Sequence, residues 1–113
     1  MDFADVEDGE DIVTCLPVLQ EVLQGFTREA AFRTARDSML ALPIVESPLT
    51  ANVFLEAADV YRRARRAGIT VRSSVDCLIA ACALRHDLEV WHDDRDYDAL
   101  SRVVPLRVRR VPG

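Results

Sequence analysis

The chain has 113 residues, half of them apolar, which is enough to bury one hydrophobic core and too apolar for a disordered segment. Its longest apolar run, eight residues at 77–84, is far short of the ~20 that a membrane span needs, and no signal-peptide pattern opens the chain. We therefore expect a cytoplasmic protein with no membrane contact. The net charge of −5 gives no general attraction to nucleic acid, although all fourteen basic residues are arginines, whose planar fork suits phosphate.

The first half of the chain predicts a strand, two helices and a second strand. Residues 1–11 carry six acids without periodicity and are predicted to be irregular. The apolar run at 11–15 predicts a buried strand, and the stripe that follows predicts a helix that begins near Pro17 and ends at Gly25. A second helix is expected at 28–42, before a short strand around Ile44 and Val45.

The second half alternates helices with strands. Thr50 and Gly68 bound a long predicted helix, with an apolar face formed by Val53, Phe54, Ala57, Tyr61 and Ala64. Ser73 and Asp76 resemble a capping box at the start of a helix that is apolar all round and therefore buried. A strand at 88–92, a short helix at 95–103 and a last strand at 106–111 complete one α/β domain, residues 1–113, with a mostly parallel sheet.

Three acids fall where such a fold could bring them together. Asp94 directly follows the strand at 88–92, and ligands of open parallel sheets lie beyond the carboxyl ends of the strands. Asp76 stands at the start of the apolar helix and Glu21 within the first amphipathic one. Converging carboxylates would provide the hard oxygen ligands that Mg²⁺ prefers.

Each acid also has an interpretation that needs no metal. Asp76 could only cap its helix, and Glu21 could point to solvent. Asp94 and Asp96 could form a turn and a helix N-terminus, where negative charge is favoured. Spacing alone does not choose between these interpretations.

The sulfur and imidazole groups do not suggest a second metal site. Cys15, Cys77 and Cys82 are odd in number and lack CxxC spacing, so we interpret them as buried, reduced core thiols. His86 and His92 are interpreted as ordinary surface or strand-end residues.

Several stretches taken together resemble the PIN-domain ribonucleases, and specifically the VapC toxins of bacterial toxin–antitoxin pairs. The most specific are "GITVRSSVDCLIAACAL", in which an acid opens the apolar helix, and "HDDRDYD", the acidic turn after the strand. The helix "LQEVLQG" adds support, and the resemblance covers about residues 12–111.

The resemblance implies a PIN-like three-layer α/β/α fold and Mg²⁺- or Mn²⁺-dependent cleavage of RNA. It implies that Glu21, Asp76, Asp94 and Asp96 are the catalytic, metal-holding residues, with Tyr97 at a position where phenylalanine is common. It also implies a homodimer and a cognate antitoxin that covers the site with a segment often bearing arginine.

One departure concerns the start of the domain. PIN domains begin with a hydrophobic strand that ends in a metal-binding aspartate, and neither Asp2 nor Asp5 follows an apolar run. We therefore expect the first strand to be missing and the edges of its neighbours to be exposed. Two alternatives stay open: a catalytically weak or dead remnant that acts only through protein binding, and a PIN nuclease of RNA processing. The arginines at 62–66 and 107–110 are candidate phosphate contacts.

Overall fold

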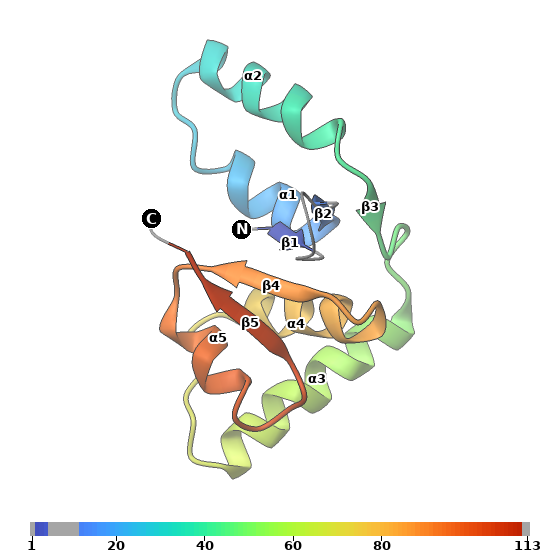
Figure 1. The fold of residues 1–113 in the computed structure, drawn as a ribbon, viewed down its shortest axis with the longest axis vertical. Helices are drawn as coiled ribbons and strands as arrows, with labels where there is room; N and C mark the ends of the chain where they lie inside the picture. The colour runs from blue at the N-terminus through green and yellow to red at the C-terminus, as the bar shows by residue number, and fades with distance from the viewer. Residues whose placement is uncertain (1, 5–11, 112–113) are drawn as a thin grey trace.

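The computed structural model describes residues 2–4 and 12–111 and has an α/β architecture (Figure 1). The strands are β1 (Asp2–Ala4), β2 (Ile12–Cys15), β3 (Ile44–Val45), β4 (Glu89–His92) and β5 (Arg107–Arg110). The helices are α1 (Leu16–Leu23), α2 (Glu29–Leu40), α3 (Ala51–Arg66), α4 (Ser74–Arg85) and α5 (Arg95–Leu100). Every element predicted from Ile12 onward is therefore confirmed, with its ends shifted by at most a few residues.

The strands form one mixed sheet in the order β3-β2-β1-β4-β5, in which all strands but β1 run in the same direction. Strand β2 pairs parallel with β3, and β4 pairs parallel with β5. Strand β1 is antiparallel to both of its neighbours, β2 and β4, so these two and their partners all run in one direction. The carboxyl ends of four strands consequently face the same edge of the sheet.

The prediction of an irregular start is wrong for residues 2–4, because β1 occupies the centre of the sheet. Its backbone pairs Phe3 with Val13 on one side and with Val90 on the other. The inner edges of β2 and β4 are thus covered rather than exposed, contrary to expectation. Strand β1 forms because its backbone pairs with two segments, one of them distant in the chain. The local sequence of this acidic stretch does not predict such pairing. Asp5 lies outside the described residues.

Helix α4 is the centre of the core, as its apolar sequence predicted. It lies behind β4 and packs lengthwise against α3 (Figure 1). Its buried residues are mostly small: Cys77, Ile79, Ala80, Ala81, Cys82 and Ala83. Small side chains let the two helices approach closely, and α3 likewise buries two small residues, Ala57 and Ala64.

Helix α3 ends as predicted at Gly68, which has φ +80°. The amide of Gly68 donates to the carbonyl of Arg65, and that of Ile69 donates to the carbonyl of Ala64, a Schellman motif. The predicted apolar face is wrong at Phe54, which is 51% exposed, while Val60 takes a buried place instead. In the described part of the chain, no helix is long and apolar enough to cross a membrane.

Candidate metal centre

Asp76 lies in the first turn of α4 and is only 3% exposed. Its carboxylate does not complete the predicted capping box, because Ser73 makes no side-chain cap hydrogen bond. The Asp76 Oδ1 atom instead accepts a hydrogen bond of 3.1 Å from the hydroxyl of Tyr97, a fully buried residue of α5. Asp76 is therefore held from across the core and not by its own helix end.

Asp94 and Asp96 lie on the turn that links β4 to α5. Asp94 is the N-cap of α5, and its Oδ1 accepts the amide of Asp96 at 2.9 Å. The amide of Asp94 in turn donates to Nδ1 of His92 at 3.1 Å. His92 is 1% exposed, so its interpretation as a strand-end residue is confirmed and the surface alternative is wrong.

The fold brings three of the four predicted acids together. One carboxylate oxygen from each of Asp76, Asp94 and Asp96 lies within 4.8 Å of the other two. Burial differs among them, because Asp76 and Asp96 are buried and Asp94 is half-buried. Of the three acids predicted to converge, Asp76 and Asp94 do so, and the third member of the cluster is Asp96, not Glu21.

Glu21 lies apart from this trio, on α1, and is half-buried. Its Oε1 atom is buried without a hydrogen-bond partner among the described residues. Burial raises the pKa of Glu21, and the negative charge of Asp94 raises it further. A buried carboxylate oxygen without a hydrogen-bond partner, under the influence of a second negative charge, is the arrangement that a cation would relieve.

Asp76 carries the clearest electrostatic signature of the site. Its pKa is raised from 3.8 to about 6, and burial, the largest cause, outweighs the opposing effect of the Tyr97 hydrogen bond. The charges of Asp94, Glu21 and Asp96 raise the pKa further. Burial also raises the pKa of the Tyr97 hydroxyl, so Tyr97 stays protonated and remains a donor.

Arg72 belongs to this site, although sequence reasoning missed it. It lies on the loop before α4, where its Nη2 donates to Asp94 Oδ1 at 2.9 Å and its Nε donates to Asp96 Oδ2 at 3.2 Å. These bonds, the one to Asp96 above all, raise the pKa of Arg72. Pairing across more than twenty residues has no signal in the sequence, even though Arg72 lies within the resembling stretch.

The hydrogen bonds divide the oxygens of the three acids into two sets. Among the described residues, the bonds to Asp94 end on Oδ1, those to Asp96 end on Oδ2 and the bond to Asp76 ends on Oδ1. The second oxygen of each carboxylate is left for another partner. Three hard oxygen donors of this kind fit Mg²⁺ or Mn²⁺, which commonly take a few carboxylates and complete their shell with water.

The remaining predictions about single residues have mixed outcomes. Cys15, Cys77 and Cys82 are buried free thiols, as predicted. Asp93 and Asp98, the other acids of the "HDDRDYD" stretch, pair with Arg110, and Asp98 Oδ1 also lies 3.2 Å from Nε2 of His92. The three arginines of β5, which are candidate phosphate contacts, are exposed and already paired with acids. Arg107 pairs with Asp87, Arg109 with Glu89, and Arg110 with Asp93 and Asp98.

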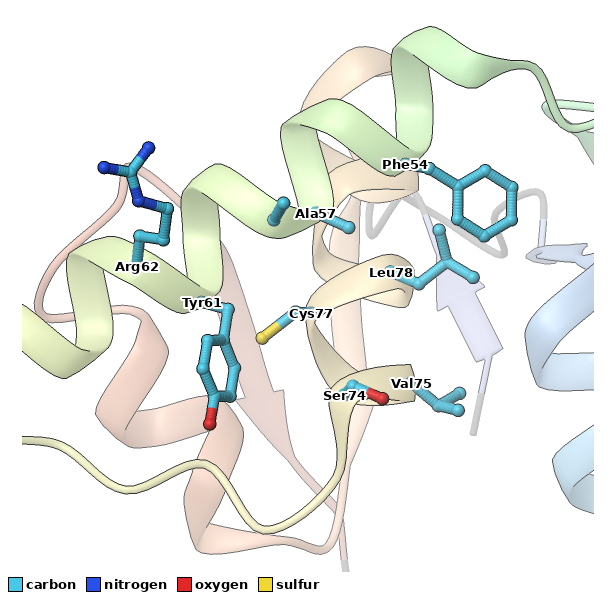
Figure 2. Close-up of a pocket in the computed structure, with 9 residues that line it drawn as sticks. Phe54, Ala57, Tyr61, Arg62, Ser74, Val75, Cys77 and Leu78 are labelled. Atoms are coloured by element: carbon cyan, nitrogen blue, oxygen red, sulfur yellow. The ribbon is translucent and has the colours of Figure 1, made fainter.

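An apolar groove of about 500 Å³ runs between α3 and α4 beside this site (Figure 2). Phe54 and Leu78 lie next to each other at one end, and Tyr61 lies across from Ser74 at the other. Phe54, Val75 and Leu78 also line an adjoining hollow of about 410 Å³ that contains Glu21. The exposed apolar surface thus extends as far as Glu21.

Comparisons with known proteins agree with this geometry. The PIN domain profile matches residues 2–103. The chain is a PIN-domain protein of the VapC ribonuclease family. It is 40% identical over 101 residues to VapC ribonuclease Mb1587 of Mycobacterium bovis, covering 89% of this chain and 75% of the relative. Ribonuclease VapC11 of Mycobacterium tuberculosis matches to the same extent.

Solved structures share the fold at lower sequence identity. VapBC2 from Rickettsia felis, bound to a promoter DNA fragment, has a TM-score of 0.71 at 16% identity, covering 88% of this chain and 74% of that one. VapBC-1 from nontypeable Haemophilus influenzae has a TM-score of 0.68 at 13% identity, covering 94% and 78%. The predicted family and the predicted PIN-like α/β class are both confirmed.

Proposed function

We propose that this VapC-family protein is an endoribonuclease toxin that hydrolyses RNA phosphodiester bonds with Mg²⁺ or Mn²⁺. The observation that carries the proposal is the convergence of Asp76, Asp94 and Asp96 within 4.8 Å at the carboxyl end of β4. Glu21, with its unsatisfied buried oxygen, is proposed as the fourth acid of the site.

The residues of the chain have separable tasks in this proposal. Asp76, Asp94 and Asp96 would hold the cation through their free oxygens, and Glu21 would complete the negative surface. A divalent cation bound there supplies a lower pKa for an attacking water and positive charge beside the phosphate. Tyr97 donates to Asp76 Oδ1 and would fix the orientation of that carboxylate. The exposed rim of the turn leaves an approach for a single strand of RNA.

We also propose a cognate antitoxin and a homodimer as partners. The solved structures with the same fold are VapBC and FitAB assemblies, which supports a second protein as partner. The apolar grooves lined by Phe54, Val75 and Leu78 adjoin Glu21 and would accept an apolar segment whose end reaches the acids. Such a partner would block RNA by covering the site.

Cleavage of RNA by the purified chain tests the proposal. We expect cleavage with Mg²⁺ or Mn²⁺ that is lost in EDTA and in the Asp76→Asn variant. A folded protein that binds the metal and its partner but leaves RNA intact would contradict the nuclease and favour a function in protein binding alone.

A further inference from the structure

We propose that Arg72 is a positioning residue whose guanidinium bridges Asp94 and Asp96 and keeps their second oxygens directed toward the cation. This inference rests on the proposed function and adds a residue to it. The feature that carries it is the way in which one arginine side chain contacts two of the three converging acids and leaves one oxygen of each untouched.

Arg72 is held at both ends. Its backbone amide donates to Asp96 Oδ2 at 3.3 Å, and its Nε donates to the same oxygen at 3.2 Å. Its Nη2 reaches Asp94 Oδ1 at 2.9 Å, the oxygen that also accepts the amide of Asp96. The loop before α4 and the first turn of α5 are therefore joined through one side chain.

The charges at the site need such a bridge. Carboxylates this close repel each other, and Asp96 is buried where water screens the repulsion poorly. Within the described residues, Arg72 is the cation whose ion pairs end on Asp94 and Asp96. Arg110 forms ion pairs with the neighbouring acids Asp93 and Asp98.

The bonding pattern distinguishes a positioning residue from a competitor of the metal. A competing arginine would occupy the oxygens that the cation needs. Arg72 instead binds Asp94 Oδ1 and Asp96 Oδ2, which already accept backbone amides, and so leaves the second oxygen of each carboxylate without a bond to it. Residues that orient the ligands of a metal in this way typically change its affinity about 10- to 100-fold when removed.

The test measures Mn²⁺ affinity in the absence of RNA, using the full chain and the Arg72→Ala and Arg72→Lys variants. Arg72→Ala keeps the backbone amide on Asp96 and removes only the guanidinium. Arg72→Lys keeps the charge but lacks the planar fork that reaches two carboxylates. Arg63→Ala is the matched control, because Arg63 also pairs with an aspartate, Asp59, on an exposed surface.

We expect the dissociation constant for Mn²⁺ to rise at least about 10-fold in Arg72→Ala. In Arg72→Lys it should rise by more than about fivefold. Arg63→Ala should bind as the parent does. Cleavage of RNA by Arg72→Ala should recover when Mn²⁺ is raised to saturation. Circular dichroism in EDTA checks that each variant is folded.

Several results would overturn the role of Arg72. Equal or tighter Mn²⁺ binding by Arg72→Ala would make it a bystander or a competitor. Parent-like binding by Arg72→Lys would show that charge suffices without the bridge. A cleavage defect that persists at saturating Mn²⁺, with unchanged affinity, would assign Arg72 to the substrate.

The same data separate this inference from the proposed function. A parent chain that binds Mn²⁺ but leaves RNA intact fails as a nuclease while the role of Arg72 stands. A parent chain that binds no Mn²⁺ overturns both.

Discussion

The acids of the site come from two regions that hold them differently. Between α4 and α5, each of Asp76, Asp94 and Asp96 accepts at least one hydrogen bond from another residue of the protein. On α1, Glu21 has a buried oxygen without a partner among the described residues. The first region therefore sets its own geometry before any cation is present, while the position of Glu21 depends on what binds beside it. We therefore expect substitutions in the trio to reduce metal binding and cleavage more than a substitution of Glu21 does.

The largest effect is expected for Asp76→Asn, which removes the most buried of the tethered acids. Metal-dependent cleavage should fall by more than about 100-fold, since even residues that only orient ligands cost about 10- to 100-fold. Initial rates across a Mn²⁺ series measure the loss. Asp98→Asn is the matched control, because Asp98 lies in the first turn of α5 but outside the trio.

Asp76→Asn should also stabilise the metal-free protein. Between pH 3.8 and about 6 the folded chain keeps a proton on Asp76 that the unfolded chain loses, so stability falls as the pH rises through this window. Above about pH 6 the parent chain loses stability because it buries a charged Asp76, and the neutral asparagine of the variant avoids this loss. We expect a melting temperature about 5 °C higher in EDTA at pH 7.5, as about 1 kcal/mol would give. A lower melting temperature would contradict the assigned cost of burial.

The pH dependence of metal binding follows from the same group. A cation needs the deprotonated carboxylate, and the pKa of Asp76 is raised to about 6. Mn²⁺ affinity should therefore decrease as the pH is lowered from 7 to 5. Titrations at half-unit steps measure this, and an affinity that stays constant down to pH 5 would contradict it.

A smaller effect is expected for Glu21→Gln, in the region without tethers. The variant keeps the shape of the side chain and removes its charge, so cleavage should fall about 10-fold while folding is unchanged. Glu29→Gln, an exposed glutamate paired with Arg33, is the control. A loss as large as that of Asp76→Asn would show that Glu21 is held as firmly as the trio.

Tyr97→Phe tests one tether directly. Removing the hydroxyl leaves Asp76 Oδ1 without its donor, which should cost about 1 kcal/mol of stability and about fivefold in Mn²⁺ affinity. The pKa of Asp76 should rise further, because the hydrogen bond lowers it. Tyr61→Phe, whose hydroxyl accepts from Arg65 on an exposed surface, is the control. An unchanged pH profile in Tyr97→Phe would remove Tyr97 from the site.

The smallest effect is expected on β5, whose arginines pair with acids outside the trio. Replacing Arg107, Arg109 and Arg110 with Ala should weaken RNA binding and flatten its salt dependence by less than about 0.7 per arginine, because each already pairs with an acid. Binding measured from 50 to 300 mM salt checks this. A double variant of Arg33 and Arg36 on α2 serves as control, and equal slopes in all three proteins would exclude β5 from the RNA contact.

Local patterns sufficed for the helices and strands from Ile12 onward but not for strand β1 or for the hydrogen bonds that hold the acids. Apolar periodicity, Gly68 and the strand before Asp94 predicted helices, ends and the carboxyl edge correctly, because each depends on neighbours in sequence. Strand β1, the bridge of Arg72 and the bond from Tyr97 to Asp76 all join segments far apart in the chain. Their partners are determined by how the folded chain packs, and the local sequence around each residue does not predict that. Phe54 was misplaced for a related reason, since helical spacing does not say where a buried face ends.

The small residues of α4 have a consequence for how the sequence can vary. Ala80, Ala81 and Ala83 are fully buried yet have almost no side chain to lose, so truncation there leaves little cavity. Enlargement would force α4 away from α3 and β4, at about 1 to 3 kcal/mol for each added group. In a library of random variants, tolerance along this helix should follow side-chain volume more closely than polarity. Asp76 lies one turn before Ala80, so enlargement of Ala80 would displace the acid even where the domain still folds.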